Sequence, residues 1–453
     1  MNTVDGAAAA LWTIHLNLAC GTLPQYAAKC TEKRELCRTI LALEVSSFQG
    51  TLYATEVGHG LDSQNIETRA ELLPDVSFEI HTPNSRAAKS IHAPAGGTPK
   101  IAVVMARLIA KGQNYGSMRQ GISCRPLPDR SGTRPIGHAI TTFNHVKLPA
   151  TAFVGDIKST LHPRIQFLTS IWRLGIGSAT MAALCIPALR VATYITTQYA
   201  KRRMVENSQG MVVPILSFRT TQVPILRALC QAAVLEAFYK EIRPHFSAAE
   251  DLDLSAVVNI RNGLAVLFKT LSVHHYRESS ITLTDRLGAQ GLFTENPLVS
   301  LGKIRGMTIA EGDISVICIR LASELLLGRY SLPASRHPKC LLALHEQAVR
   351  AEMRGLLKSM NNRHRSEDVN RLLLPRSMAL IIAIGHAVIQ DHAWYMESGV
   401  SSRKDAMAAD RFLNDSGSEL YVTAPVISAS SWDNYVATLP LLECAKSLRS
   451  NPQ

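Results

Sequence analysis

The chain has 453 residues, 46% of them apolar, which is enough for two or three packed units with a hydrophobic core. Its 48 lysines and arginines outnumber 36 acidic residues, giving a net charge of +12, but the basic residues are scattered and seldom lie beside aromatic residues. This distribution argues against a nucleic-acid groove. It leaves open a merely basic surface or sites for anionic small ligands such as nucleotide diphosphates.

Nine cysteines include no Cys-x-x-Cys pair, and several lie in apolar stretches. They indicate reduced core thiols of an intracellular protein, and neither a disulfide framework nor a zinc site. His274, His275 and His364 lack partners at metal-ligand spacing, so we expect no metal. The N-terminal five residues carry no basic region, which argues against a secretory signal.

Residues 7–49 are rich in Ala, Leu, Cys and Glu, and their apolar residues recur at helical spacing. Two helices fit this segment. From 52 to about 149 the pattern changes to short strands at 76–80, 101–108 and 140–148, separated by stretches rich in Pro, Gly and Ser. Such a pattern is typical of a small β domain.

The segment Leu52-Tyr-Ala-Thr-Glu-Val-Gly-His-Gly-Leu61 combines strand formers, a hydroxyl group and two close glycines. Gly58 and Gly60 permit positive φ and would let a flat ligand approach the main chain. Thr55 places a hydroxyl group just before this corner. Taken alone, the pattern indicates a strand that ends in a glycine-containing turn.

From 161 to 330 the sequence predicts a helical bundle. One long apolar helix or a kinked pair is expected at 168–200, with the kink at Pro187, and further helices at 223–243 and 254–276. The apolar window 174–196 is interrupted by Pro187 and Arg190, so we expect a buried bundle helix and no membrane span.

The tail from 332 to 453 has two further helical runs, near 340–360 and 372–395. The polar run 361–368 between them predicts a solvated loop. The tail contains no motif that indicates a catalytic or binding site.

Thr308-Ile-Ala-Glu-Gly-Asp313 precedes an apolar helix expected at 314–328. Local physics offers a structural explanation for the charged residues. Thr308 and Glu311 have the spacing of a capping box, and Asp313 lies where the positive end of a helix favours an anion.

In combination, two of these segments resemble acyl-CoA oxidases and acyl-CoA dehydrogenases. The segment around Thr55, with Glu67-Thr68 after it, resembles the flavin-contacting segment of that family, and Glu311-Gly-Asp313, about 250 residues later, resembles its catalytic-glutamate segment. The resemblance implies that Glu311 is the base. It also implies that Thr55 and Gly58 contact FAD.

Weaker resemblances implicate further cofactor contacts. Tyr199-Ala-Lys-Arg-Arg203 resembles an element whose arginine pairs with the FAD diphosphate, which implies Arg203, with Arg202 as the neighbouring option. Gln222 matches a glutamine that contacts FAD across a subunit interface. Gly288 and Gly291 match two glycines of a loop near the cofactor, where Ala289 and Gln290 replace the family's Gly and His.

The chain also departs from the family pattern. Ser90-Ile-His-Ala-Pro-Ala-Gly-Gly97 replaces a Trp-Trp-Pro-Gly-Gly segment, so the aromatic wall beside the flavin is absent and Gly96 is the candidate for the FAD-contacting glycine. The stretch 117–138 is short and dissimilar to the family's. About eighty residues that precede position 14 in the family are absent, which indicates a truncated domain or a misassigned start codon.

The implied fold class is α+β, mainly α. We expect a remnant N-terminal helical domain at 1–51, a small β domain at 52–150, a helical bundle carrying the flavin and catalytic site at 151–331, and a C-terminal helical domain at 332–453. The resemblance further implies FAD as cofactor, an acyl-CoA-type substrate and a homodimer.

The implied activity is FAD-dependent α,β-desaturation of an acyl-CoA or related activated acyl chain, either in a specialised pathway or in peroxisomal β-oxidation. The alternative is a non-catalytic binding or assembly partner that has lost a working flavin site. Family resemblance favours a peroxisomal location, although the C-terminal residues do not form a Ser-Lys-Leu-type signal.

Overall fold

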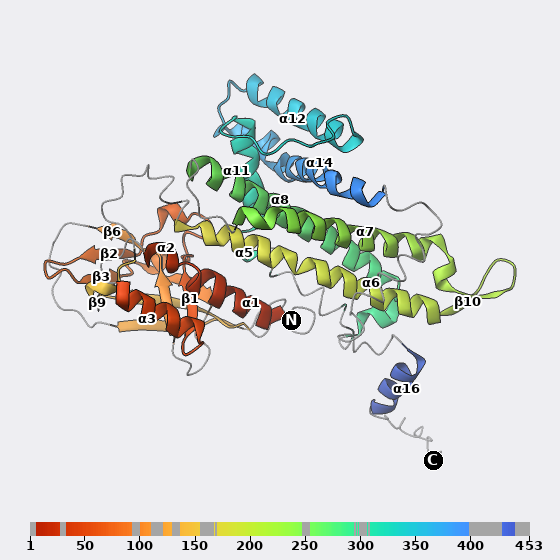
Figure 1. Ribbon diagram of the computed structural model, residues 1–453, viewed down its shortest axis with the longest axis horizontal. Coiled ribbons are helices and arrows are strands. Elements are labelled where there is room, and N and C mark those ends of the chain that lie inside the picture. The colour runs from red at the N-terminus through yellow and green to blue at the C-terminus, as the bar shows by residue number, and fades with distance from the viewer. Residues whose placement is uncertain are drawn as a thin grey trace, which may run out of the picture.

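The computed structural model describes residues 6–27, 33–92, 100–109, 121–128, 136–154, 167, 170–246, 254–293, 296, 298, 306, 309–397 and 428–439. Short strands gather at one end of the molecule beside the N-terminal helices, and long helices extend from them as a bundle (Figure 1). The expected α+β, mainly α, fold class is confirmed.

The N-terminal segment is helical, as predicted. Helix α1 (Gly6–Trp12) continues directly into the π-helical stretch η1 (Thr13–Cys20), and α2 (Pro24–Ala27) and α3 (Lys33–Glu44) follow. His15 joins this segment to the first strand because its Nδ1 accepts the Gly50 N–H at 2.8 Å and its Nε2 lies 3.1 Å from the Leu43 carbonyl oxygen.

The described strands of the N-terminal third form three small sheets. Strand β1 (Gln49–Tyr53) pairs in parallel with β5 (Lys100–Val104). A four-stranded sheet has the order β6-β2-β3-β9, and a three-stranded sheet has the order β4-β8-β7. Their bounds are β2 Arg69–Leu72, β3 Phe78–His81, β4 Lys89–His92, β6 Arg107–Ile109, β7 Gly121–Pro126, β8 His138–Asn144 and β9 Val146–Leu148. Short 3-10 turns occupy η2 (Ser63–Asn65), η3 (Ser85–Ala87) and η4 (Ala150–Ala152).

Two of the three predicted strands are divided in the structure. The strand expected at 101–108 leaves its sheet at Met105 and becomes β5 and β6. The strand expected at 140–148 breaks at His145, which has a left-handed φ of 47° and separates β8 from β9. A left-handed residue cannot continue an extended strand, so the chain changes sheet at this point.

The bundle begins with two helices in line, α5 (Trp172–Ala183) and α6 (Cys185–Arg202). The break lies at Leu184, three residues before Pro187, close to the predicted kink. Proline has no N–H to bond the carbonyl four residues earlier, and its ring crowds that carbonyl, so the helix breaks there.

Helix α7 (Arg219–Ile242) starts four residues earlier than predicted, which places Pro224 inside it. Because proline cannot donate to the Thr220 carbonyl, that oxygen is left over within the helix. Arg286, after the end of α8, donates to it over 3.5 Å. Helix α8 (Leu254–Asp285) itself runs nine residues beyond its predicted end.

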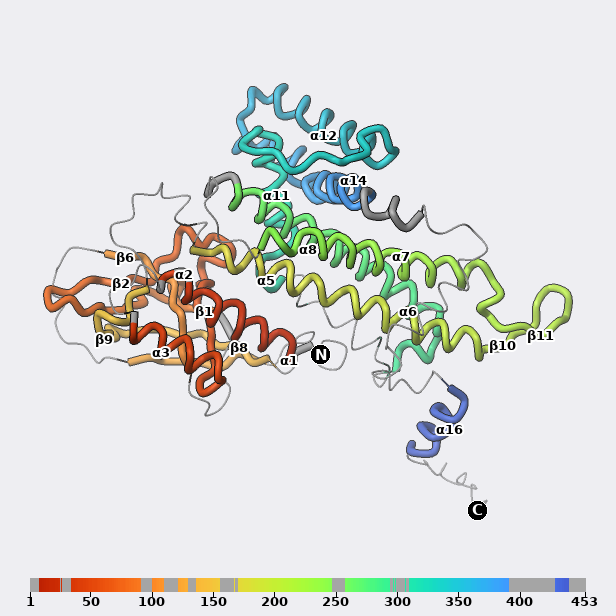
Figure 2. The backbone as a smooth tube through the Cα atoms, viewed as in Figure 1, coloured from red at the N-terminus to blue at the C-terminus, as the bar shows by residue number. Residues whose placement is uncertain are grey.

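The remaining elements connect and cover this bundle. The hairpin β10 (Met204–Glu206) and β11 (Val212–Pro214) projects from its far end (Figure 2). The other bounds are η5 Ile215–Ser217, η6 Arg243–Phe246, η7 Gly288–Leu292, α11 Ile314–Leu326, α12 Leu341–Ser359, α13 Glu367–Leu372, η8 Leu374–Arg376, α14 Ser377–Glu397 and α16 Ala429–Thr438. Asn361 and Asn362 have positive φ in the turn after α12, where the solvated loop was predicted.

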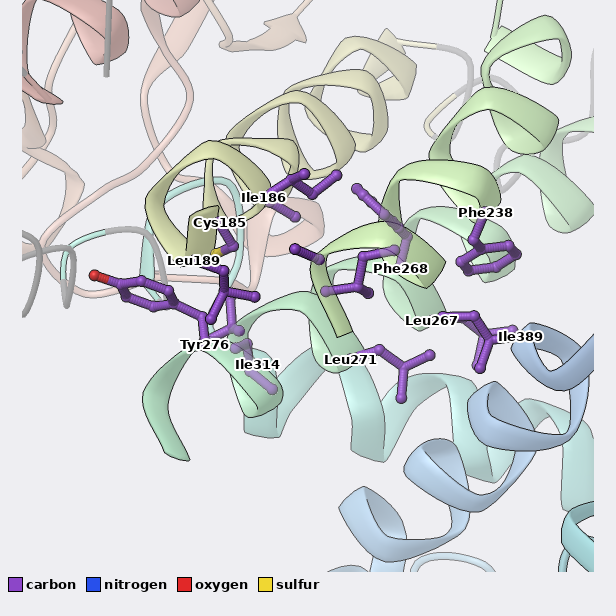
Figure 3. Packing of buried hydrophobic residues seen from close by; sticks show 14 of the residues in the cluster. Cys185, Ile186, Leu189, Phe238, Leu267, Phe268, Leu271, Tyr276, Ile314 and Ile389 are labelled. Atoms are coloured by element: carbon purple, nitrogen blue, oxygen red, sulfur yellow. The ribbon is translucent and has the colours of Figure 1, made fainter. Parts of the chain in front are cut away.

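One large hydrophobic core holds the bundle together. Leu267, Phe268 and Leu271 of α8 lie among Leu189 of α6 and Phe238 of α7 (Figure 3). Two helical segments, Trp172–Arg202 and Glu367–Gln390, are long and apolar enough to cross a membrane by length and composition alone. About half of each apolar window is buried inside the protein, which is also typical of core helices.

Candidate functional site

The Glu311 backbone forms a left-handed turn immediately before α11. Glu311 has φ +59° and Gly312 has φ +109°, a conformation that a non-glycine residue adopts only at an energetic cost. Helix α11 starts after Asp313, whose side chain accepts hydrogen bonds from the N–H groups of Ser315 at 3.0 Å and Val316 at 3.3 Å. Thr308 of the predicted capping box lies outside the described residues. Asp313 is the N-cap residue of α11, so Glu311 precedes the cap and does not occupy the third helical position that a capping box requires.

The Glu311 carboxyl group is buried against the first helix of the bundle, although the residue as a whole is partly exposed. A Cβ atom built on Gly177 of α5 would lie 2.7 Å from Glu311 Cδ, so only glycine leaves room for the carboxyl group at this position. The next residue, Ser178, donates its hydroxyl hydrogen to the Glu311 carbonyl oxygen at 2.6 Å. Glu311 Oε2 is buried and has no hydrogen-bond partner among the residues that the structure describes.

A buried lysine lies beside the same turn. Lys269, in the middle of α8, is fully buried, and its Nζ donates to the carbonyl oxygen of Gly312 at 2.6 Å and to that of Ala310. Burial raises the pKa of Glu311 to about 8, and the Lys269 charge acts in the opposite direction. Burial lowers the pKa of Lys269 to about 8, opposed by the charges of Glu311 and Asp313. A carboxyl group that exchanges its proton near neutral pH suits general acid–base chemistry.

The second predicted segment forms the corner that follows β1. Thr55 is half-buried there, and its carbonyl oxygen accepts the Ser90 N–H at 3.0 Å. Gly58 and Gly60 do not adopt the positive φ that glycine permits. Gly58 instead leaves room for a neighbouring side chain, because a Cβ atom there would lie 2.7 Å from Arg86 Cβ.

A buried ion pair holds this corner in place. Glu56 Oε1 accepts from Lys89 Nζ at 2.9 Å and from the Thr68 hydroxyl at 2.6 Å, and the backbone N–H groups of Glu67 and Thr68 also donate to the carboxylate. Both charged side chains are fully buried. Burial alone would raise the pKa of Glu56, but the hydrogen bonds from Thr68, Glu67 and Lys89 outweigh it and hold that pKa below its ordinary value.

The corner and the Glu311 turn both adjoin the first turns of α5. Leu174 packs against the cluster that contains Leu52 and Ala54, directly before Thr55. Gly177, which contacts the Glu311 carboxyl group, is only three residues further along the same helix, or roughly 4.5 Å of helix rise. The structure thus brings the neighbourhoods of Thr55 and Glu311 together along α5.

The other predicted cofactor residues lie at the far end of the bundle. Arg203 is exposed directly after α6, and its carbonyl oxygen accepts the Ile215 N–H at 2.9 Å. Gln222, in the first turn of α7, donates its side-chain amide to the Leu216 carbonyl oxygen at 2.9 Å. The turn η5 therefore holds Arg203 and Gln222 close to each other.

The loop after α8 reaches the same end. Gly288 has φ +59° with open space where a side chain would be, whereas Gly291 is buried against the Thr284 carbonyl oxygen. Arg286 Nε and Gln290 Oε1 are buried without hydrogen-bond partners among the described residues. This combination of open space and unpaired polar atoms would suit a polar portion of a ligand.

The predicted site residues thus form two groups. Helix α8 carries Lys269 beside Glu311 and ends next to Gly288, and these positions are separated by roughly 24 Å along the helix at 1.5 Å per residue. The remaining candidate, Gly96, lies outside the described residues. Sequence reasoning did not single out Lys269, although a lone charge in the apolar stretch 264–273 was an available signal. Gly177, Ser178 and the pairing of Glu56 with Lys89 had no comparable signal.

Comparison with curated proteins points to one family. The chain is 31% identical to an acyl-coenzyme A oxidase of Eremothecium gossypii over 323 residues, which are 62% of this chain and 44% of that protein. It is 24% identical to peroxisomal acyl-coenzyme A oxidase 1 of Arabidopsis thaliana, over 51% of this chain and 40% of that protein, and 27% identical to human peroxisomal acyl-coenzyme A oxidase 3, over 48% and 33%. These relatives are all acyl-CoA oxidases, and the similarity supports placing the chain in the acyl-CoA oxidase and acyl-CoA dehydrogenase family. No family model matches the sequence.

Solved acyl-CoA oxidases have the same fold. Acyl-CoA oxidase 1 of Yarrowia lipolytica superposes with a TM-score of 0.72 at 15% identity, covering 96% of this chain and 74% of that structure. Acyl-CoA oxidase-2 of Caenorhabditis elegans, solved with FAD, ascaroside-CoA and ATP, gives 0.71 at 16% identity, covering 94% and 72%. Butyryl-CoA dehydrogenase of Megasphaera elsdenii also matches, with a TM-score of 0.57 at 16% identity, covering 72% and 79%. The aligned segments span 33–44% of the lengths of the three curated relatives.

Proposed function

We propose that the protein catalyses FAD-dependent α,β-desaturation of an acyl-CoA or a related activated acyl chain. The observation that supports this most directly is the Glu311 carboxyl group, which is buried on α5 with one oxygen unpaired and with a pKa raised to about 8 by burial. The similarity to acyl-CoA oxidases supports this reaction class.

In this proposal Glu311 removes the proton on the carbon next to the thioester carbonyl. Bound FAD supplies the acceptor for the hydride that leaves the neighbouring carbon. The backbone N–H of Glu311 would donate to the thioester oxygen, where negative charge develops as the proton leaves. Ser178 and Lys269, which bind the carbonyl groups of this turn, fix the direction in which that N–H and the carboxyl group point.

The cofactor would be held by both groups of residues. Thr55 would contact the ring beside α5, while Arg203 would pair with the diphosphate next to Gln222 and Gly288. The open space at Gly288 and the unpaired atoms of Arg286 and Gln290 fit such a polar group.

The separation of the two groups supports a homodimer with shared sites. Because roughly 24 Å of α8 lies between them, we infer that the corner of one chain and the far bundle end of a second chain hold the same cofactor. Exposed apolar side chains near that end fit a subunit contact, namely Met204, Met211, Val212 and Val223, with exposed fractions of 47, 52, 66 and 43%.

Location and pathway follow from the relatives and from the departures. The Arabidopsis and human relatives are named peroxisomal, which supports a peroxisomal location for this protein. The replaced segment 90–97 and the short segment 117–138 support a specialised acyl-chain pathway over bulk fatty-acid breakdown. Turnover of common fatty acyl-CoAs as fast as by an ordinary oxidase would contradict the specialised role.

The decisive test is anaerobic mixing of the purified protein with a panel of acyl-CoAs while flavin absorbance is followed. We expect bleaching by at least one acyl-CoA. Glu311→Gln should still bind FAD but should bleach at least about 100-fold more slowly. Because the base must be ionised, the bleaching rate should rise with pH and level off above about pH 8. Unchanged bleaching in Glu311→Gln would refute the assignment of the base.

A non-catalytic binding or assembly partner is the second candidate. The changed segment 90–97 and the Gln222 amide, which is already bonded to Leu216, favour it. The two functions differ in the visible spectrum. Yellow protein supports the enzyme, whereas colourless protein that takes up no added FAD supports the partner.

A further inference from the structure

We propose that Lys269 is a positioning residue for Glu311. Its ammonium group donates hydrogen bonds to the carbonyl groups on both sides of Glu311, and this keeps the Glu311 carboxyl group against α5 in a form that can ionise. The inference rests on the proposed function in one respect only, namely that Glu311 is the base. It concerns a residue outside both sequence motifs.

The hydrogen bonds of Lys269 are directed at one turn. Its Nζ reaches the carbonyl oxygens of Ala310 and Gly312 and thus brackets Glu311 from across the bundle. Glu311 has a left-handed φ of +59°, an unfavourable conformation for a non-glycine residue that persists only where the surrounding structure holds it. Ser178 fixes the third consecutive carbonyl, that of Glu311 itself. Three successive carbonyl groups are therefore held from α5 and α8.

The charge of Lys269 also acts on the Glu311 carboxyl group. An ammonium group has three N–H donors, and the two carbonyl oxygens engage two of them. Glu311 Oε2 is buried and unpaired among the described residues, so a nearby positive charge is what its ionised form needs. Among the described residues, the ionisable groups that act on Lys269 are the carboxyl groups of Glu311 and Asp313 and the thiols of Cys185 and Cys318.

If Lys269 had a purely structural role, an uncharged side chain could take its place. Burying an ammonium group is costly, and an apolar side chain of similar size is commonly as stable in such a position. An apolar side chain would not stabilise an ionised Glu311, whereas the charge of Lys269 favours the ionised form. Lys269 therefore sets when the base becomes ionised as well as where it points.

The test measures ionisation of Glu311 directly, without turnover. The infrared band of a protonated buried carboxyl group is followed against pH and assigned to Glu311 by its loss in Glu311→Gln. In Lys269→Gln, which keeps a donor and removes the charge, we expect the midpoint of this band to move up by about one to three pH units. Lys269→Arg, which keeps the charge, should stay near the wild-type midpoint. Lys240→Gln, at an exposed position on α7, should leave the midpoint unchanged.

Flavin bleaching provides the second readout. At pH 7, Lys269→Gln should bleach at least about tenfold more slowly, with the loss partly recovered at higher pH, because one pH unit corresponds to a tenfold change in the ionised fraction. A Glu311 midpoint that is the same in Lys269→Gln and wild type would overturn the proposal, whether or not the protein turns over acyl-CoA. A shifted midpoint in a protein that never bleaches would uphold the pairing of Lys269 with Glu311 and refute the desaturase function instead.

Discussion

Replacing Glu311 by glutamine should stabilise the fold, and the gain should depend on pH. The folded protein holds the Glu311 proton up to about pH 8, whereas the unfolded chain releases it near 4.5. Below pH 4.5 both states are protonated and the carboxyl group costs nothing. Between 4.5 and 8 the folded state binds more protons than the unfolded state, so stability falls as pH rises.

The size of the effect follows from the two pKa values. The difference of about 3.5 pH units corresponds to about 5 kcal/mol of unfolding free energy above pH 8, and the partial span to pH 7 corresponds to about 3 kcal/mol. Glutamine has the same shape and does not titrate, so Glu311→Gln removes this loss. Lys269 loses its anionic partner in the variant, which makes the gain above pH 8 smaller than the full figure.

Urea unfolding at a series of pH values from 5 to 9 tests the prediction. The curves of wild type and Glu311→Gln should nearly coincide at pH 5 and diverge steadily towards pH 8. Glu352→Gln, at an exposed carboxyl group on α12, should run parallel to wild type throughout. Parallel curves for Glu311→Gln as well would mean that Glu311 is ionised in the folded protein at ordinary pH, and the reasoning on the buried base would fail.

Three further substitutions test the supporting contacts. Lys89→Met leaves its buried carboxylate partner unpaired and should lower the unfolding free energy by about 3 to 5 kcal/mol, measured by urea unfolding. Asp313→Ala should cost about 1 kcal/mol because α11 loses its N-cap, whereas Asp313→Asn should cost much less; thermal midpoints distinguish the two. Gly177→Ala should slow flavin bleaching at least about tenfold because its methyl group displaces the Glu311 carboxyl group, whereas Gly355→Ala, with open space around it in α12, should not slow bleaching and should stabilise the fold by about 0.5 to 1 kcal/mol. Equal bleaching rates in Gly177→Ala and Gly355→Ala would contradict the close packing at Gly177.

The fold class followed from periodicity because apolar spacing reports the buried face of a helix or strand directly. Pro187 also indicated the α5–α6 break, since the loss of a backbone donor is a local property of one residue. Element ends were less accurate. Helix α7 includes Pro224, and the Thr220 carbonyl that this proline leaves without a donor receives a hydrogen bond from Arg286, a contact between distant residues that no local rule reports.

The residues of the candidate site also divide into those that the sequence indicated and those that only the structure revealed. Glu311 and Thr55 were indicated by short motifs, and the structure brings their neighbourhoods together along α5, although the roles given to them remain predictions. Lys269 and Gly177 act through contacts with residues more than forty positions away. The spacing of a motif holds no information on such contacts.

The closed ring of hydrogen bonds around the Glu56 carboxylate has a consequence for ligand capture. Four donors from Glu67, Thr68 and Lys89 already hold the corner beside Thr55 in shape. A planar ring that binds there would meet a corner that is already ordered, so binding would not have to order a flexible loop. Binding would then cost little conformational entropy of the chain, so most of the free energy of the new contacts would contribute to the binding affinity.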